Sequence, residues 1–163
     1  FVYNDPRRPT SAAMQYDKRL SEFALMDENN PQNINRLRRE ETFYSYIKEI
    51  IQLIEIQRKI DFLEKYGKLK ELFLKIAERS EGILIVFGSY ANFSANEKSD
   101  LDFFVIGNIL EIEDLEEFYN IKINIVKSDK NRFNKNEHII KEIIKNHIVL
   151  KGVESFDELI WQV

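Results

Sequence analysis

The sequence predicts an α/β (α+β) fold, in which a small mixed β-sheet is flanked by helices and preceded by a helical N-terminal region. From Phe43 through Ala77, apolar residues recur every three or four positions, which is the period of an amphipathic helix. From Gly82 onward, apolar residues instead form short runs of strand length, separated by polar or helix-like segments. Because strands and helices alternate in this second region, we expect the helices to pack against one sheet.

Residues 1–41 are predicted to be an N-terminal extension or the remnant of a separate domain. This region is polar, holds all three prolines and includes an alternating stretch at 19–27 that could form a strand. Asn30 can cap a helix, and Pro31 suits its first position, where a missing N–H costs nothing. The predicted division of the chain is 1–41, a connecting helix at 42–66 and a main domain at 67–163.

The main domain is predicted to contain three strands and four helices. Strands are expected near 82–88, 101–107 and 121–127, and helices at about 68–79, 111–119, 136–147 and 154–161. Gly67 separates the first of these helices from the connecting helix. The segment 136–152 is interpreted as helical because its isoleucines form an apolar stripe, so no strand is assigned there.

Composition indicates a soluble globular protein, since 44% of its 163 residues are hydrophobic and 32% are charged. No apolar run has the length of a membrane span and no signal segment is visible, so we expect a cytoplasmic protein without a membrane partner. The absence of cysteine excludes disulfides and thiolate metal sites. His138 and His147, nine residues apart, lack a ligand-pair spacing and are expected to face solvent or cap a helix. Because the chain begins at Phe1 and its first methionine is Met14, we expect a piece of a longer gene product.

A glycine-serine pair and two aspartates mark the main candidate site. Gly88-Ser89 ends one predicted strand, and after ten intervening residues Asp100 and Asp102 open the next. Side chains alternate along a strand, so the two carboxylates share one face, and their repulsion favours a divalent cation such as Mg²⁺. Glycine lets the backbone approach a phosphate closely, and the serine hydroxyl can bind phosphate oxygens. By itself, Gly88-Ser89 would suit an ordinary strand-to-helix turn; beside the aspartates it predicts a site for a metal and a phosphorylated ligand.

Residues 82–107 resemble the signature of the DNA polymerase beta type nucleotidyltransferase superfamily, and in particular its minimal nucleotidyltransferase branch. The resemblance implies catalytic and metal-binding roles for Asp100 and Asp102, and nucleotide binding by Gly88 and Ser89. It implies two cofactors: Mg²⁺ or Mn²⁺, and a nucleoside triphosphate, for which ATP is the first candidate. The implied reaction transfers a nucleoside monophosphate to a hydroxyl of a protein or RNA. Such members are often antitoxins that modify a HEPN-type ribonuclease toxin, or toxins that modify tRNA, so both are expected partners.

The sequence departs from this family pattern in two places. Where members commonly have Arg-Gly, this chain has Asn92-Phe93, so the arginine is absent. Active members also present a third acidic residue on the third strand, and Asn124 falls at that position. An asparagine can offer a carbonyl oxygen to a metal, but it cannot accept a proton as a carboxylate does. Asn124 is therefore the third candidate catalytic residue, while Asp129, Glu111 and Glu113 are expected to be surface acids.

The N-terminal region bears a weaker resemblance, to the end of the winged helix-turn-helix domain of some archaeal minimal nucleotidyltransferases. That resemblance implies DNA binding only through a region missing from the N-terminal side. Two function classes follow from the sequence. The intact Gly88-Ser89 and Asp100-Leu101-Asp102 set favours a nucleotidyltransferase, in a toxin–antitoxin pair. Asn124 favours the alternative, a catalytically impaired module that senses nucleotide or neutralises a partner.

Overall fold

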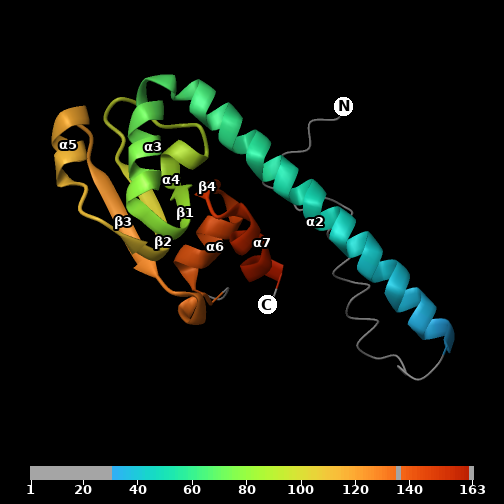
Figure 1. Ribbon diagram of the computed structural model, residues 1–163. Coiled ribbons are helices and arrows are strands. Elements are labelled where there is room, and N and C mark those ends of the chain that lie inside the picture. The colour runs from blue at the N-terminus through green and yellow to red at the C-terminus, as the bar shows by residue number, and fades with distance from the viewer. Residues whose placement is uncertain (1–30, 135–136, 162–163) are drawn as a thin grey trace. The chain divides into compact units, whose positions relative to one another are not determined.

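The computed structural model describes residues 31–134 and 137–161 (Figure 1). By its internal contacts the chain divides into two compact units, Phe1–Leu53 and Ile54–Val163. The candidate site lies entirely in the second unit. The strand expected at 19–27 and the winged-helix remnant fall on residues outside the described part of the chain.

The helical region before the sheet has the order that the sequence predicts. Helix α2 spans Pro31–Lys65 and begins with proline at its first position, as expected. A 3₁₀ helix, η1, at Gly67–Leu69 then separates α2 from α3, Lys70–Arg79. Gly67 therefore marks the break between two helices, as the sequence indicated.

The sheet has four strands in the order β3-β2-β1-β4. The strands are β1 Ser80–Phe87, β2 Leu101–Ile109, β3 Ile123–Ser128 and β4 Ile148–Lys151. Strand β1 is antiparallel to both β2 and β4, while β2 and β3 are parallel, so the sheet is mixed. The predicted fold class is confirmed, and the three expected strands are present within two residues of their predicted bounds.

The fourth strand is a correction to the sequence interpretation, which treated 136–152 as helical. Helix α6 covers only His138–Lys145, and Asn146, with φ −153° and ψ 105°, already has an extended backbone. Ile148, Val149 and Leu150 follow it, and all three are buried. Successive apolar side chains suit a strand that is covered on both faces, which the helical stripe concealed.

Helices cover both faces of the sheet (Figure 1). The remaining helices are α4 Gly88–Ala91, α5 Glu113–Tyr119, η2 Lys130–Arg132 and α7 Val153–Trp161. Leu84 and Val86 of β1 belong to a core cluster with residues of α2, α3 and α5. Ile83 and Ile85 belong to a second cluster with residues of α6 and α7. The alternation of β1 side chains thus builds two apolar layers, one on each face.

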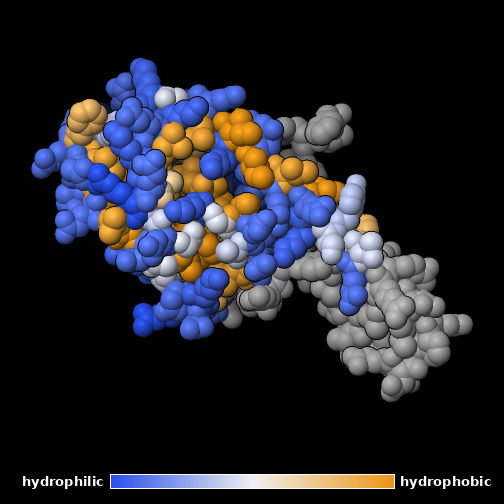
Figure 2. Space-filling model, in the orientation of Figure 1, coloured by the Kyte–Doolittle hydropathy of each residue, from blue (hydrophilic) through white to orange (hydrophobic). Residues whose placement is uncertain are grey.

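The surface mixes hydrophilic and apolar areas (Figure 2). Among the described residues, no helix has the length and apolar character needed to span a membrane. Figure 2 shows apolar surface interspersed with hydrophilic surface, including apolar areas along α2. Ile56 and Ile60 of that helix are each 43% exposed.

Candidate active site

The strand directions bring the predicted site residues to one end of the sheet. Because β1 and β2 are antiparallel, the last residue of β1, Phe87, pairs with Asp102 near the start of β2. Because β2 and β3 are parallel, Asp102 pairs in turn with Asn124 near the start of β3. Gly88, directly after Phe87, therefore lies against Asp102 on one side, and Asn124 lies against Asp102 on the other, at the same end of the sheet.

Gly88 fits against the Asp102 carboxylate in a way that a larger residue does not allow. Its φ of +70° lies in the left-handed region, which side chains with a Cβ disfavour. A Cβ built on Gly88 would lie only 2.6 Å from Asp102 Oδ2. The glycine thus provides both the turn geometry and the space for the carboxylate.

The turn after Gly88 is held by polar contacts. The carbonyl oxygen of Ser89 accepts a hydrogen bond from Ser94 N at 3.0 Å. Asn146, in the amide orientation that satisfies both partners, donates to the Ala91 carbonyl at 3.1 Å and accepts from Asn92 N at 3.2 Å. The residue that directly follows α6 therefore anchors the turn that contains Ser89.

Aromatic contacts also link the same turn to Tyr66 of the preceding helical region. Tyr66 packs 4.9 Å from Tyr90 and 6.3 Å from Phe93, measured between ring centroids. Lys65 Nζ donates to the Phe93 carbonyl at 2.7 Å. Burial raises the pKa of both Tyr66 and Tyr90 above the ordinary tyrosine value. Phe93, at the position where the family commonly has glycine, has a left-handed φ of +62°.

One cationic group and one amide contact the aspartate pair. Asn124 Nδ2 donates to Asp102 Oδ1 at 2.9 Å and lies 3.3 Å from Asp100 Oδ2. Lys122 Nζ is also 3.3 Å from Asp100 Oδ2, and the two side chains are 69% and 41% exposed. Sequence reasoning missed Lys122, although its position two residues before Asn124 puts both side chains on one face of an extended chain.

The alternative acids have local structural roles. Asp129 Oδ1 accepts hydrogen bonds from Asn131 N and Arg132 N, both at 2.9 Å, and so caps η2 beyond the far end of β3. Glu113 accepts from Ile112 N at 3.0 Å, and Glu111 is exposed. Within 31–134 and 137–161, no group of three or more His, Cys, Asp or Glu side chains is placed to hold a metal. The site thus offers two carboxylates and one amide.

His147 is only 6% exposed, so the expectation that it faces solvent is wrong, whereas the alternative expectation of a capping residue agrees with its contact to the carbonyl of Ile143 in the last turn of α6. Its Nδ1 lies 2.8 Å from the Ile143 carbonyl, which can only accept, so Nδ1 donates this hydrogen bond. Its Nε2 lies 2.9 Å from Glu55 Oε1, and Glu55 is also buried. This pair joins α2 to the start of β4 within the second unit, so its role is structural.

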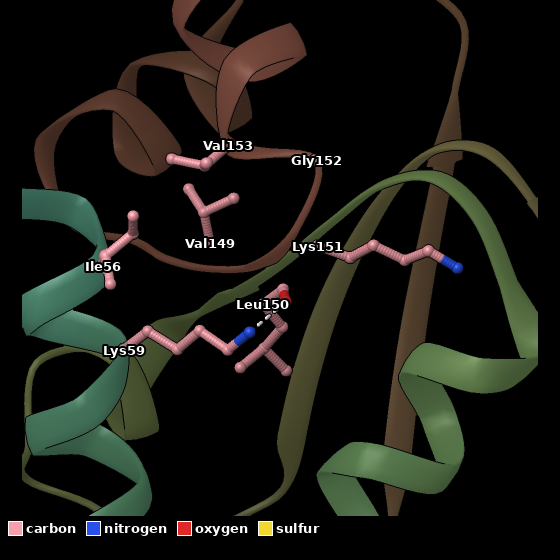
Figure 3. Close-up of a pocket in the computed structure, with 7 residues that line it drawn as sticks. All are labelled: Ile56, Lys59, Val149, Leu150, Lys151, Gly152 and Val153. Atoms are coloured by element: carbon pink, nitrogen blue, oxygen red, sulfur yellow. Dashed lines mark hydrogen bonds between the residues drawn. The ribbon is translucent and has the colours of Figure 1, made fainter. Parts of the chain in front are cut away.

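A separate shallow hollow of about 120 Å³ lies at the opposite edge of the sheet, beside β4. Figure 3 shows Ile56 of α2 facing Val149 and Val153 across it, while Lys59 of the same helix extends toward Leu150. Lys59 Nζ donates to the Leu150 carbonyl at 2.9 Å. This hydrogen bond gives a partner to a backbone carbonyl of β4, which is an edge strand. The hollow is lined mainly by aliphatic side chains and lacks the carboxylates of the candidate site.

The donor set at the candidate site fits a small divalent cation. Asp100 and Asp102 supply hard oxygen ligands, as Mg²⁺ prefers, and Asn124 would supply its carbonyl oxygen after a rotation of the amide. Gly88 leaves open the space beside Asp102 that a Cβ would fill. Two carboxylates leave further coordination positions to water and phosphate, which is how Mg²⁺ is commonly held in phosphoryl-transfer sites.

A family comparison agrees with this arrangement. The model of the nucleotidyltransferase domain matches residues 67–154, which is more than half of the chain and includes all the candidate site residues. The chain belongs to the nucleotidyltransferase domain family. Among solved structures, a crystal structure of a toxin–antitoxin with AMP-PNP is similar over 63% of this chain and 77% of that chain. Its sequence identity is 16% and its TM-score 0.40. The search of curated proteins gave no match.

Proposed function

We propose that this protein transfers a nucleoside monophosphate from a magnesium–nucleoside triphosphate complex to a hydroxyl of a protein or RNA. ATP is the first candidate for the triphosphate. The observation that carries the proposal is the placement of Gly88 and Asn124 on either side of Asp102 at one end of the sheet, in a chain of this family. Phosphoryl transfer depends mainly on alignment and charge neutralisation, so a carboxylate pair beside an open backbone turn suits it.

Each residue has a stated role in this proposal. Asp100 and Asp102 would hold Mg²⁺ or Mn²⁺, which when bound neutralises negative charge on the triphosphate. Gly88 leaves the backbone accessible to phosphate, and the Ser89 hydroxyl can donate to a phosphate oxygen. Asn124 orients Asp102 through the 2.9 Å hydrogen bond from its amide. An asparagine cannot accept the acceptor's hydroxyl proton, so turnover is expected to be slow.

The sequence resemblance supports a finer proposal about context. We assign the chain to the minimal nucleotidyltransferase branch, with a HEPN-type toxin or tRNA as acceptor and a cytoplasmic location. DNA binding would come through a winged-helix region upstream of residue 1. The division into an extension at 1–41, a connecting helix at 42–66 and a catalytic domain at 67–163 belongs to the same proposal.

A nucleotide-transfer assay tests the activity. Each of the four α-labelled triphosphates would be incubated with the protein, Mg²⁺ or Mn²⁺, and either bulk tRNA or candidate partner proteins. We expect label in one acceptor, and loss of it in Asp102→Asn. Transfer that persists in Asp102→Asn would contradict the proposed roles of the aspartates.

A second candidate function is a nucleotide-sensing or antitoxin module without turnover. The specific observation in its favour is that the Asn124 amide donates toward both carboxylates, where an active enzyme would need a third acid. Titration calorimetry with ATP, with and without Mg²⁺, separates the two functions when combined with the transfer assay. Metal-dependent nucleotide binding without transfer supports the module, and equal binding by wild type and Asp100→Asn/Asp102→Asn contradicts both functions.

A further inference from the structure

One member of the aspartate pair, Asp100, forms an ion pair with a lysine of the same chain, Lys122. Lys122 Nζ lies 3.3 Å from Asp100 Oδ2, within ion-pair distance. The same oxygen lies 3.3 Å from Asn124 Nδ2, so one carboxylate oxygen faces an ammonium and an amide together. Both groups are hydrogen-bond donors without an available lone pair on nitrogen, and neither can ligate a metal through that atom.

We propose that Lys122 is a built-in competitor for the divalent cation and thereby sets the metal affinity of the nucleotide-free protein. The inference rests on the proposed function, because it assumes that Asp100 and Asp102 form the metal site. An ammonium beside Asp100 neutralises one carboxylate and repels an incoming divalent ion. The ion must therefore displace Lys122 before it can use Asp100 Oδ2.

Exposure makes this competition reversible. The Lys122 side chain is 69% exposed and the Asp100 side chain 41% exposed, so solvent and salt screen their attraction. Exposed ion pairs of this kind are weak, and the flexible lysine chain can swing into solvent once the carboxylate is taken. Lys122 therefore lowers metal affinity without closing the site.

The chain offers a matched control on the same edge of the sheet. Lys127 is exposed and lies five residues beyond Lys122, roughly 16 Å along an extended strand. That separation exceeds the screening length of about 8 Å at physiological ionic strength. Lys122→Gln and Lys127→Gln remove the same charge, but only the first removes it from Asp100.

The test measures Mn²⁺ binding to nucleotide-free protein by electron paramagnetic resonance, which needs no turnover. We expect Lys122→Gln to bind Mn²⁺ about three- to tenfold more tightly than wild type, with Lys127→Gln unchanged. The gain should shrink as NaCl is raised. Circular dichroism melts establish that both variants are folded.

Equal affinities in wild type and Lys122→Gln, equal shifts in both lysine variants, or no Mn²⁺ binding by Lys122→Gln would each overturn the inference. The transfer assay is read separately on the same proteins. If wild type transfers nucleotide but Lys122→Gln binds Mn²⁺ no more tightly, the competitor role of Lys122 is wrong and the proposed activity stands. If Lys122→Gln binds Mn²⁺ more tightly but no variant transfers nucleotide, the competitor role of Lys122 stands and the proposed activity is wrong.

Discussion

Asn124 lies directly across from Asp102 on neighbouring parallel strands, and its amide nitrogen is 2.9 Å from Asp102 Oδ1. At this register position a carboxylate would face Asp102 at the same distance and repel it in the absence of a cation. The asparagine therefore avoids a third negative charge at this position and donates a hydrogen bond to Asp102 instead. This relationship makes Asn124 the most informative residue to change.

We expect Asn124→Asp to raise nucleotide transfer on the order of a hundredfold, because it adds a proton acceptor and a metal ligand. The measurement is incorporation of labelled nucleotide, with Asn124→Asp/Asp102→Asn as the inactive control. A wild type that is already robustly active and loses activity in Asn124→Asp would show that another residue serves as the base.

We expect Gly88→Ala to impair the site more than the fold. Alanine at a φ of +70° costs about 1 kcal/mol of stability, and its Cβ, only 2.6 Å from Asp102 Oδ2, would push the carboxylate aside. Gly67→Ala is the matched control, since a Cβ on Gly67 meets no heavy atom within 4 Å. Metal-dependent nucleotide binding should fall at least tenfold in Gly88→Ala and stay unchanged in Gly67→Ala. Equal binding by the two variants would argue against a role for this close approach.

The left-handed backbone at Phe93 should make two truncations of its side chain differ in stability. Both Phe93→Gly and Phe93→Ala remove the ring that packs near Tyr66, but only glycine adopts a φ of +62° without strain. Urea denaturation should therefore find Phe93→Gly more stable than Phe93→Ala by about 1 kcal/mol. The reverse order would mean that the turn relaxes out of the left-handed conformation when the ring is lost.

The buried Glu55 and His147 pair should show strong coupling. Glu55→Ala leaves His147 Nε2 buried without its carboxylate partner, and such a change costs about 3 kcal/mol of the free energy of unfolding. Glu55→Leu/His147→Phe replaces both partners with apolar groups and should lose less than the sum of the single losses. Additive losses in chemical denaturation would indicate that the two side chains do not depend on each other.

Tyr66 and Tyr90 should make the fold sensitive to alkaline pH. Burial raises their folded-state pKa above about 10, the unfolded value, so the folded state retains protons that the unfolded state releases. The stability they contribute is present below pH 10 and is lost as the pH rises through the folded pKa. Absorbance of phenolate near 295 nm should show tyrosines titrating above pH 10, and Tyr90→Phe should lessen the alkaline loss of stability.

Local pattern was sufficient for much of this molecule. Strand-length apolar runs predicted β1, β2 and β3, and the spacing of Gly88-Ser89 from Asp100 and Asp102 predicted a site at their ends, because period and turn chemistry are local properties. Strand β4 escaped prediction because three consecutive apolar residues suit a buried strand and a buried helix alike, and only pairing with β1 distinguishes them. Three features depend on strand register and helix packing: the closeness of Gly88 to Asp102, the Lys122 contact with Asp100 and the burial of His147 against Glu55. Those are decided by contacts between residues distant in sequence, which the tertiary structure alone supplies.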